Sequence, residues 1–262
     1  MLCSDRAPGL MYLLNRAPDR GYAFDIACVL TSSPTFEEEV RVERRGIPTI
    51  VHPIAEFYAQ RRAPFPCDPE ARRAYDAETR RRIEPFFPDV VLLDGYLYLV
   101  TAPLLTPYRN RVINLHFSDL TLRNADGSPR FPGKRAVRDA IAAGCRHTRA
   151  TVHLVNERPD DGAPIVRSWP FPVPPILDDA GTLRAANVFK MCVAAHQRWM
   201  MQTASGPLMA AALRLIAAGA FNPDEAALEP STARTTAWLL DEGGALTAPE
   251  MDPMAAPAFA RA

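Results

Sequence analysis

The chain has 262 residues, with 30 acidic and 30 basic side chains and a formal net charge of zero at neutral pH. This length can bury a sizeable core, either as one large domain or as one domain with a tail. The balanced charge gives no reason to expect a nucleic acid or a membrane surface as partner. No apolar run reaches the roughly 20 residues that cross a bilayer. The five scattered cysteines lack the CxxC spacing of a zinc site. We therefore expect a cytoplasmic protein that needs no metal.

Short apolar runs alternate with longer charged segments along most of the chain. The runs are typical of buried parallel strands, and two of the segments end as helices do, at Gly46 and before Pro88. The expected strands are residues 24–30, 47–51, 89–95, 112–116, 150–155 and 165–169. The expected helices are residues 37–45, 68–86, 136–143 and 182 to about 218, the last with a break near 205–207. This succession predicts an α/β fold with an open, mostly parallel, doubly wound sheet.

The last forty residues have a different character. TTAWLLDEGGALTAP, residues 235–249, predicts a small hairpin that turns at Asp241 to Gly244. The end of the chain is rich in proline and alanine and lacks the pattern of a core. We therefore expect a catalytic domain over residues 1–222, a hairpin extension packed on it over residues 223–248, and a disordered tail over residues 249–262.

The stretch VINLHFSDLT, residues 112–121, starts as a buried strand and then changes character. It places a carboxamide, an imidazole and a hydroxyl at Asn114, His116 and Ser118. Alternation puts all three on one side of an extended segment, and ligands of doubly wound sheets bind beyond the carboxyl ends of the strands. Alone, such a pattern is more often a turn or a buried polar pair. It becomes informative only together with the motifs that follow.

Three motifs in chain order carry a family resemblance. They are PDVVLLDGYLYLV at residues 88–100, the Asn-x-His-x-Ser run that starts at Asn114, and TVHLV at residues 151–155 followed by Asp161-Gly-Ala-Pro. Together with GIPTIVHP at residues 46–53, they resemble the formyltransferases that use 10-formyltetrahydrofolate. The sequence is most similar to the phosphoribosylglycinamide formyltransferase branch of that family, over roughly residues 2–205. The resemblance implies a Rossmann-like variant of the doubly wound fold.

The resemblance also implies a reaction and a set of site residues. A formyl group would pass from 10-formyltetrahydrofolate, as co-substrate, to a primary amine, with glycinamide ribonucleotide of purine biosynthesis as the first candidate acceptor. Asn114 and His116 would stabilise the oxyanion, at about 3 kcal/mol for each such donor, and Asp161 would support proton transfer. The loop after His153 is one residue longer than in the family, so Asp160 is the alternative to Asp161. The implied folate-binding residues are Gly95, Tyr96, Leu97, Tyr98, Leu99, Val155, Asn156 and Asp160, and the implied acceptor-binding residues are Ser4, Arg6, Gly9, Ser118 and Gly133.

Two departures from the family pattern keep the acceptor open. In the N-terminal loop, where the family holds a phosphate, Asp5 would repel an anion and Pro8 lacks an amide donor, although Arg6 can pair with one. The insert of residues 119–131 is longer than in the family, and its turn chemistry predicts a hairpin over the acceptor pocket.

Several alternatives therefore remain. An amino sugar or another small amine is the second acceptor class, and hydrolysis of formyltetrahydrofolate would use similar groups. The non-enzyme alternative is a folate- or nucleotide-binding homologue without turnover. His153 fits a buried structural histidine as well as a site residue. The oligomeric state is expected to be a monomer or a homodimer.

Overall fold

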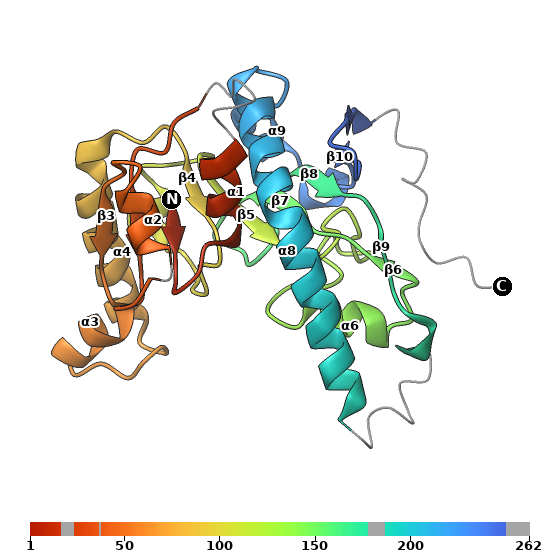
Figure 1. Cartoon of the computed structure of the whole chain (residues 1–262), viewed down its shortest axis with the longest axis horizontal. Coiled ribbons are helices and arrows are strands. Elements are labelled where there is room, and N and C mark those ends of the chain that lie inside the picture. Colours follow the sequence, from red (N-terminus) through yellow and green to blue (C-terminus); the bar gives the residue numbers. More distant parts are fainter. Residues whose placement is uncertain (17–23, 37, 178–186, 250–262) are drawn as a thin grey trace. The chain divides into compact units, whose positions relative to one another are not determined.

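The computed structural model of the chain describes residues 1–16, 24–36, 38–177 and 187–249 (Figure 1). It consists of two compact units. The first unit contains Met1–Asn114 and Leu154–Arg158, and the second contains Leu115–His153 and Pro159–Ala262. The division falls inside two strands, β5 (Val112–His116) and β7 (Thr151–Leu154).

Parallel strands form the centre of the first unit. Besides the start of β5, they are β1 (Leu2–Cys3), β2 (Val29–Thr31), β3 (Thr49–Val51) and β4 (Val91–Leu93). Their order is β5-β4-β1-β2-β3, and each pairing is parallel. Strands β3 and β4 are shorter than the apolar runs that predicted them, β5 has the predicted bounds, and β1 was not among the expected strands. The run of residues 24–30 becomes a strand only from Val29. Its first residues lie in the loop that leads to β2.

Helices connect these strands, and local sequence explains where they begin. In the first unit they are α1 (Pro8–Arg16), α2 (Glu39–Glu43), α3 (Ile54–Gln60), α4 (Pro69–Ile83) and α5 (Ala102–Leu105). Helix α4 starts where Asp68 accepts a hydrogen bond from the amide of Ala71 at 2.7 Å, with Pro69 in the first helical position. A short 3-10 turn, Glu84–Phe86, completes the predicted helix of residues 68–86.

Alternate residues of the strands pack into separate cores on the two faces of the first unit's sheet. Leu2 and Leu30 pack with Ile83 of α4, whereas Cys3 and Val29 pack with residues of α1 and α2. Because successive residues of a strand point to opposite faces, both faces are covered by apolar side chains, as a parallel sheet requires. The predicted α/β fold with a mostly parallel, doubly wound sheet is thus confirmed.

The second unit contains the antiparallel pairs. Strand β8 (Pro164–Ser168) pairs antiparallel with β7 and parallel with β10 (Trp238–Leu240), and β10 turns back on β11 (Leu246–Thr247). The amide of Gly244 donates to the carbonyl of Asp241 in that turn at 3.1 Å, so the predicted C-terminal hairpin is confirmed. A separate pair joins β6 (His147–Thr148) to β9 (Phe171–Pro172). The helices are α6 (Ala136–Ala142), α8 (Val188–Ala217) and α9 (Pro223–Leu228), with 3-10 turns at Pro175–Leu177 and Ser231–Ala233.

Helix α8 corrects one prediction, because it runs through Pro207 without the expected break. Residues on both sides of the proline, including Ala204 and Leu208, are buried, and α8 packs against β8 and α6. Packing of this kind stabilises a helix more than local propensity does, so it outweighs the loss of one backbone hydrogen bond at the proline.

The insert of residues 119–131 forms the predicted tight turn, while its place over the acceptor pocket stays a prediction. The amide of Asn124 donates to the carbonyl of Ser128 at 2.9 Å, and Arg123 and Pro129 form an antiparallel bridge. Gly127 has a φ of 79° and lies so close to the C-terminal segment that a β-carbon there would be 2.8 Å from Cγ2 of Thr232. Glycine is therefore required in this turn.

Parts of three predictions fall outside the described residues: residue 37, residues 182–186 of the last long helix, and the tail from residue 250. The extents predicted for the catalytic domain and its hairpin extension stay predictions. Within the described ranges, no helix is both long and apolar enough to cross a bilayer.

Candidate active site

His116 is the last residue of β5 and belongs to the second unit. It lies beside the carboxylate of Asp160, a residue of the same unit. Its Nδ1 atom is 3.6 Å from Oδ1 of Asp160, and its Nε2 atom is 3.3 Å from the carbonyl oxygen of Phe131. The side chains of His116 and Asp160 are 12% and 15% exposed, so they are shielded but remain accessible to a ligand. Both ring nitrogens face oxygen atoms, and the ring can hold a proton at either one.

Asp160 lies between two imidazoles. Its Oδ1 atom is also 3.9 Å from Nε2 of buried His153, whose ring centroid is 6.5 Å from that of His116. Its Oδ2 atom accepts a hydrogen bond from the amide of Gly133 at 2.7 Å. The backbone of Asp160 has a φ of 55°, a left-handed conformation that aspartate adopts more readily than most residues. One oxygen is thus held by the backbone while the other faces both rings.

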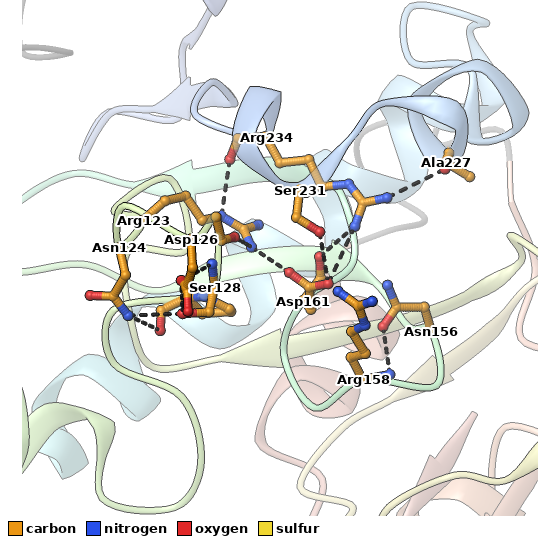
Figure 2. A network of polar contacts seen from close by, with 12 residues as sticks. Arg123, Asn124, Asp126, Ser128, Asn156, Arg158, Asp161, Ala227, Ser231 and Arg234 are labelled. Atoms are coloured by element: carbon orange, nitrogen blue, oxygen red, sulfur yellow. Dashed lines mark hydrogen bonds and ion pairs between the residues drawn. The ribbon is translucent and has the colours of Figure 1, made fainter.

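Asp161 is engaged elsewhere, as Figure 2 shows. Its Oδ1 atom is 2.7 Å from Nη1 of Arg123, its Oδ2 atom accepts a hydrogen bond from Ser231 at 3.0 Å, and its carbonyl accepts one from Arg234 at 2.8 Å. The sequence assigned the catalytic role to Asp161 and kept Asp160 as the alternative. The structure thus places the Asp160 carboxylate beside His116 and pairs the Asp161 carboxylate with Arg123, while the catalytic role of either aspartate stays a prediction.

Ser118 brings a free hydroxyl to the same unit. Its side chain is buried, and its Oγ atom has no hydrogen-bond partner among the described residues. Its carbonyl accepts a hydrogen bond from Thr151 at 2.7 Å, which fixes the backbone. A buried hydroxyl without a partner costs free energy, so Ser118 is available to a ligand. The amide of Gly133, also predicted to bind the acceptor, donates to Asp160, and its role toward an acceptor stays a prediction.

The loop after β4, residues 94–101, lies in the first unit and starts with a close backbone contact. Gly95 has a φ of 67°, and a β-carbon there would be 2.6 Å from the carbonyl oxygen of Arg6. The resemblance implies a folate-binding role for Gly95, and packing against the N-terminal loop by itself already requires a glycine here. Tyr96 is buried, and its hydroxyl accepts a hydrogen bond from Arg72 at 2.9 Å.

Helix α4 holds the rest of this loop. Arg72 is ion-paired with Asp76, and its Nε atom donates to the carbonyl of Leu99 at 2.7 Å. Asp76 accepts hydrogen bonds from the amide and the hydroxyl of Thr101, at 2.7 and 2.6 Å. Leu97 and Leu99 remain 54% and 66% exposed. The loop is therefore fixed by helix α4 and presents apolar side chains to solvent.

An internal carboxylate occupies the start of α1. Oδ2 of buried Asp94 accepts hydrogen bonds from the amides of Gly9 and Leu10, at 2.8 and 2.9 Å. Its Oδ1 atom has no partner among the described residues. Burial raises the pKa of Asp94 to about 7, although the two amides act in the opposite direction. The hydroxyl of Ser4 lies 3.0 Å from that of Ser32, and Arg6 is exposed.

The remaining predicted folate residues of the first unit follow β7. The amide of Val155 donates to the carbonyl of Val112 at 2.8 Å, which continues the sheet. Asn156 accepts a hydrogen bond from the amide of Arg158 at 3.0 Å. Asn114 lies in register with Leu93 of β4 at the end of this unit, and Tyr98 packs against its core.

The model of one protein family, described as formyl transferase, matches residues 1–190. The chain belongs to the formyl transferase family. Its fold and motif order agree with the predicted resemblance.

Proteins similar to this chain include ones named for purine biosynthesis and for formyl transfer. The trifunctional purine biosynthetic protein adenosine-3 of Drosophila melanogaster is 29% identical over 181 residues, which are 68% of this chain and 12% of that protein. Phosphoribosylglycinamide formyltransferase of Escherichia coli is 31% identical over 104 residues, 40% of this chain and 45% of that enzyme. The crystal structure of glycinamide ribonucleotide transformylase 1 from Symbiobacterium toebii matches this chain with a TM-score of 0.59 and 26% sequence identity. The match covers 83% of this chain and 86% of the Symbiobacterium chain. The chain thus spans less than half the length of these two sequence relatives.

Sequence reasoning missed the residues that support the candidate site. Asp94 could have been noticed as a lone acid after an apolar strand, and Arg72 and Asp76 as a charged pair on the apolar side of a helix. Arg123 and Arg234 gave no local signal, since their partner is far away in the sequence. Among the described residues, no group of three histidine, cysteine or acidic side chains is arranged to hold a metal ion.

Proposed function

We propose that this formyl transferase moves a formyl group from 10-formyltetrahydrofolate to a primary amine. The observation that carries the proposal is the Asp160 carboxylate facing His116 and His153 at the carboxyl end of β5. A carboxylate and an imidazole within reach of each other can move a proton and can donate to a developing negative charge.

The reaction needs both abilities. As the amine nitrogen attacks the formyl carbon, a carbon–nitrogen bond forms and the formyl oxygen gains negative charge. His116 donates to that oxygen, and the sequence adds the carboxamide of Asn114, two residues earlier on the same strand. Each such donor lowers the barrier by about 3 kcal/mol. The bond to the folate nitrogen then breaks, and the proton lost by the amine ends on that nitrogen.

Asp160 is the proposed proton carrier. It lies next to the imidazole of His116, whereas the carboxylate of Asp161 is paired with Arg123. A base must lie within hydrogen-bond reach of the proton that it takes, directly or through one water, which favours Asp160 for this role. Ser118, with its unpartnered buried hydroxyl, is proposed to bind the acceptor.

The loop after β4 is the proposed folate-binding segment. Leu97 and Leu99 are exposed apolar side chains on a loop anchored by Arg72 and Asp76, and such a surface fits a flat heterocycle. Tyr98, Val155 and Asn156 are kept in this group on the sequence resemblance. The loop is held rigid before any ligand binds, which lowers the entropic cost of binding.

Glycinamide ribonucleotide is the first candidate acceptor, because the relatives are named for it. A small amine without a phosphate, such as an amino sugar, is the second candidate acceptor. The position of Asp94 at the start of α1 favours this second candidate. The amides of Gly9 and Leu10 at the start of α1 already bind the Asp94 carboxylate, and Pro8 has no amide to offer. A phosphate at this helix start would have to compete with that internal carboxylate.

An assay with purified protein tests these proposals. The protein is mixed with 10-formyltetrahydrofolate and one of a panel of amines, and release of tetrahydrofolate is followed by its absorbance. Product with glycinamide ribonucleotide alone supports the first acceptor, and product with an unphosphorylated amine supports the second. Release of formate without any amine indicates hydrolysis. Folate binding without turnover indicates a binding homologue and contradicts the proposed reaction.

Two histidine variants of the second unit make the assay specific. His116→Ala should reduce turnover by about 100-fold or more, because it removes the proposed donor. His147→Ala replaces a half-buried histidine on β6 and should leave turnover within about twofold. Equal rates for the His116 variant and the wild type would exclude this ring from the mechanism.

The cytoplasmic location and the oligomeric state, monomer or homodimer, stay predictions from the sequence.

A further inference from the structure

Three side chains from two distant segments hold Asp161 in the second unit (Figure 2). Arg123, from the insert of residues 119–131, approaches its Oδ1 atom to 2.7 Å. Ser231 and Arg234, from the C-terminal segment, bind its Oδ2 atom at 3.0 Å and its carbonyl at 2.8 Å. The same Arg234 guanidinium also lies 3.7 Å from Oδ2. Both the side chain and the backbone of Asp161 are therefore fixed.

The two segments that hold Asp161 also bind each other. Nε of Arg123 donates to the carbonyl of Arg234 at 3.3 Å, and Nη1 of Arg123 donates to the carbonyl of Gly127 at 3.4 Å. Gly127 has no room for a β-carbon beside Thr232. The insert and the C-terminal segment thus form one support around a single carboxylate.

The support around Asp161 also restrains the neighbouring residue, Asp160. Its carboxylate must face two imidazoles, at 3.6 and 3.9 Å, from a left-handed backbone with a φ of 55°. Such a conformation persists only where the surroundings hold it. A planar peptide bond joins Asp160 to Asp161, so fixing Asp161 restricts the directions that Asp160 can take.

We propose that Asp161 is a positioning residue, which Arg123, Ser231 and Arg234 hold so that Asp160 faces His116 and His153. Asp161 itself does not touch the reacting atoms. The C-terminal segment that carries Ser231 and Arg234 is then required for the geometry of a loop 70 residues earlier in the chain. The effect on turnover rests on the proposed function, whereas the effect on the two histidine rings does not.

Arg123→Gln tests the proposal against a matched control, Arg167→Gln. Both arginines are buried in the second unit, with side chains 4% and 6% exposed, and each is ion-paired with one aspartate, Asp161 or Asp119. The Arg123 variant should change the NMR signals of the His116 and His153 rings at constant pH. It should also lower kcat by about 10- to 100-fold, as a misplaced catalytic group does, with the KM for folate within about twofold. The Arg167 variant should lower the melting temperature by a similar amount and change neither the ring signals nor kcat.

Two further variants keep the test decisive if Arg123→Gln does not fold. Arg123→Lys restores a cation and should return part of the lost kcat, and Ser231→Ala removes one hydrogen bond and should reproduce a smaller change in the ring signals. Ring signals that match the wild type in the folded Arg123 and Ser231 variants would overturn the proposal, as would equal changes in the Arg167 control. A wild-type protein without turnover would contradict the proposed function, and the ring signals would then decide on the positioning role alone.

Discussion

The loop after β4 and the loop after β7 each contain a buried aspartate, but the two loops are held in different ways. Asp94 binds the backbone amides of Gly9 and Leu10, and its loop is fixed by Arg72 and Asp76 of the preceding helix. Asp161 is bound by side chains of the insert and the C-terminal segment. The first loop presents apolar side chains, whereas the second presents the Asp160 carboxylate.

The difference lies in which elements supply the supporting side chains. The contacts that fix the first loop join residues 24 to 27 positions apart where they come from α4, and 84 or 85 positions apart where the amides of Leu10 and Gly9 hold Asp94. Those that fix Asp161 join residues 38 to 73 positions apart. The side chains that hold the first loop come from a single helix, whereas those that hold Asp161 come from two separate segments of the chain. We therefore expect chemistry to fail when the second loop is disturbed, and binding or stability to weaken when the first is.

The largest effect is expected for the residue at the tip of the second loop. Asp160→Asn should lower turnover by about 10²- to 10⁴-fold, because it removes the proposed proton carrier. Asp161→Asn should lower it by only about tenfold, through misplacement of its neighbour. Turnover of both variants is compared at saturating folate, with circular dichroism as the check of folding. A larger loss for the Asp161 variant would reverse the roles assigned here.

Asp94 should make the stability of the first unit depend on pH. Its pKa in the folded state is raised from 3.8 to about 7, so its stabilising contribution is complete below the unfolded value and is lost as the pH rises to about 7. Between about pH 5 and about pH 8, the wild type should lose about 3 kcal/mol more unfolding free energy than Asp94→Asn. Urea unfolding at several pH values measures this difference, and parallel curves for the two proteins would contradict it.

A smaller effect is expected where α4 anchors the first loop. Thr101→Val removes the hydroxyl that donates to Asp76 at 2.6 Å and should cost about 2 kcal/mol, because the lost bond goes to a buried charge. Thr106→Val, at an exposed position just after α5, is the control and should change stability by less than about 0.5 kcal/mol. Equal unfolding free energies for the two variants would mean that the anchor contributes little.

The smallest effect separates binding from folding on the first loop. Leu99→Ser removes an exposed side chain, so stability should not change, but the KM for folate should rise about fivefold through lost apolar contact. Leu228→Ser, at an 82% exposed leucine of the second unit, should leave KM unchanged. A KM equal to that of the wild type in both variants would remove Leu99 from the folate site.

Local pattern was enough to predict the framework of the fold. Apolar runs predicted β2 to β5 but not β1, and Asp241 to Gly244 predicted the turn between β10 and β11. The Asn-x-His-x-Ser motif placed His116 at the end of a strand. These features depend on residues close in sequence, through strand periodicity and turn chemistry, so a single sequence contains the necessary information.

Tertiary structure decided the features that depend on distant partners. Pro207 stays inside a helix because buried residues on both sides of it pack against other elements. Asp161 is held by Arg123, Ser231 and Arg234, which no local pattern connects to the loop after β7. No pattern in the residues around Asp94 predicts that it is buried against the start of α1. Local patterns in the chain therefore predict most of the strands and the position of the imidazole, whereas contacts between distant residues fix which carboxylate faces it.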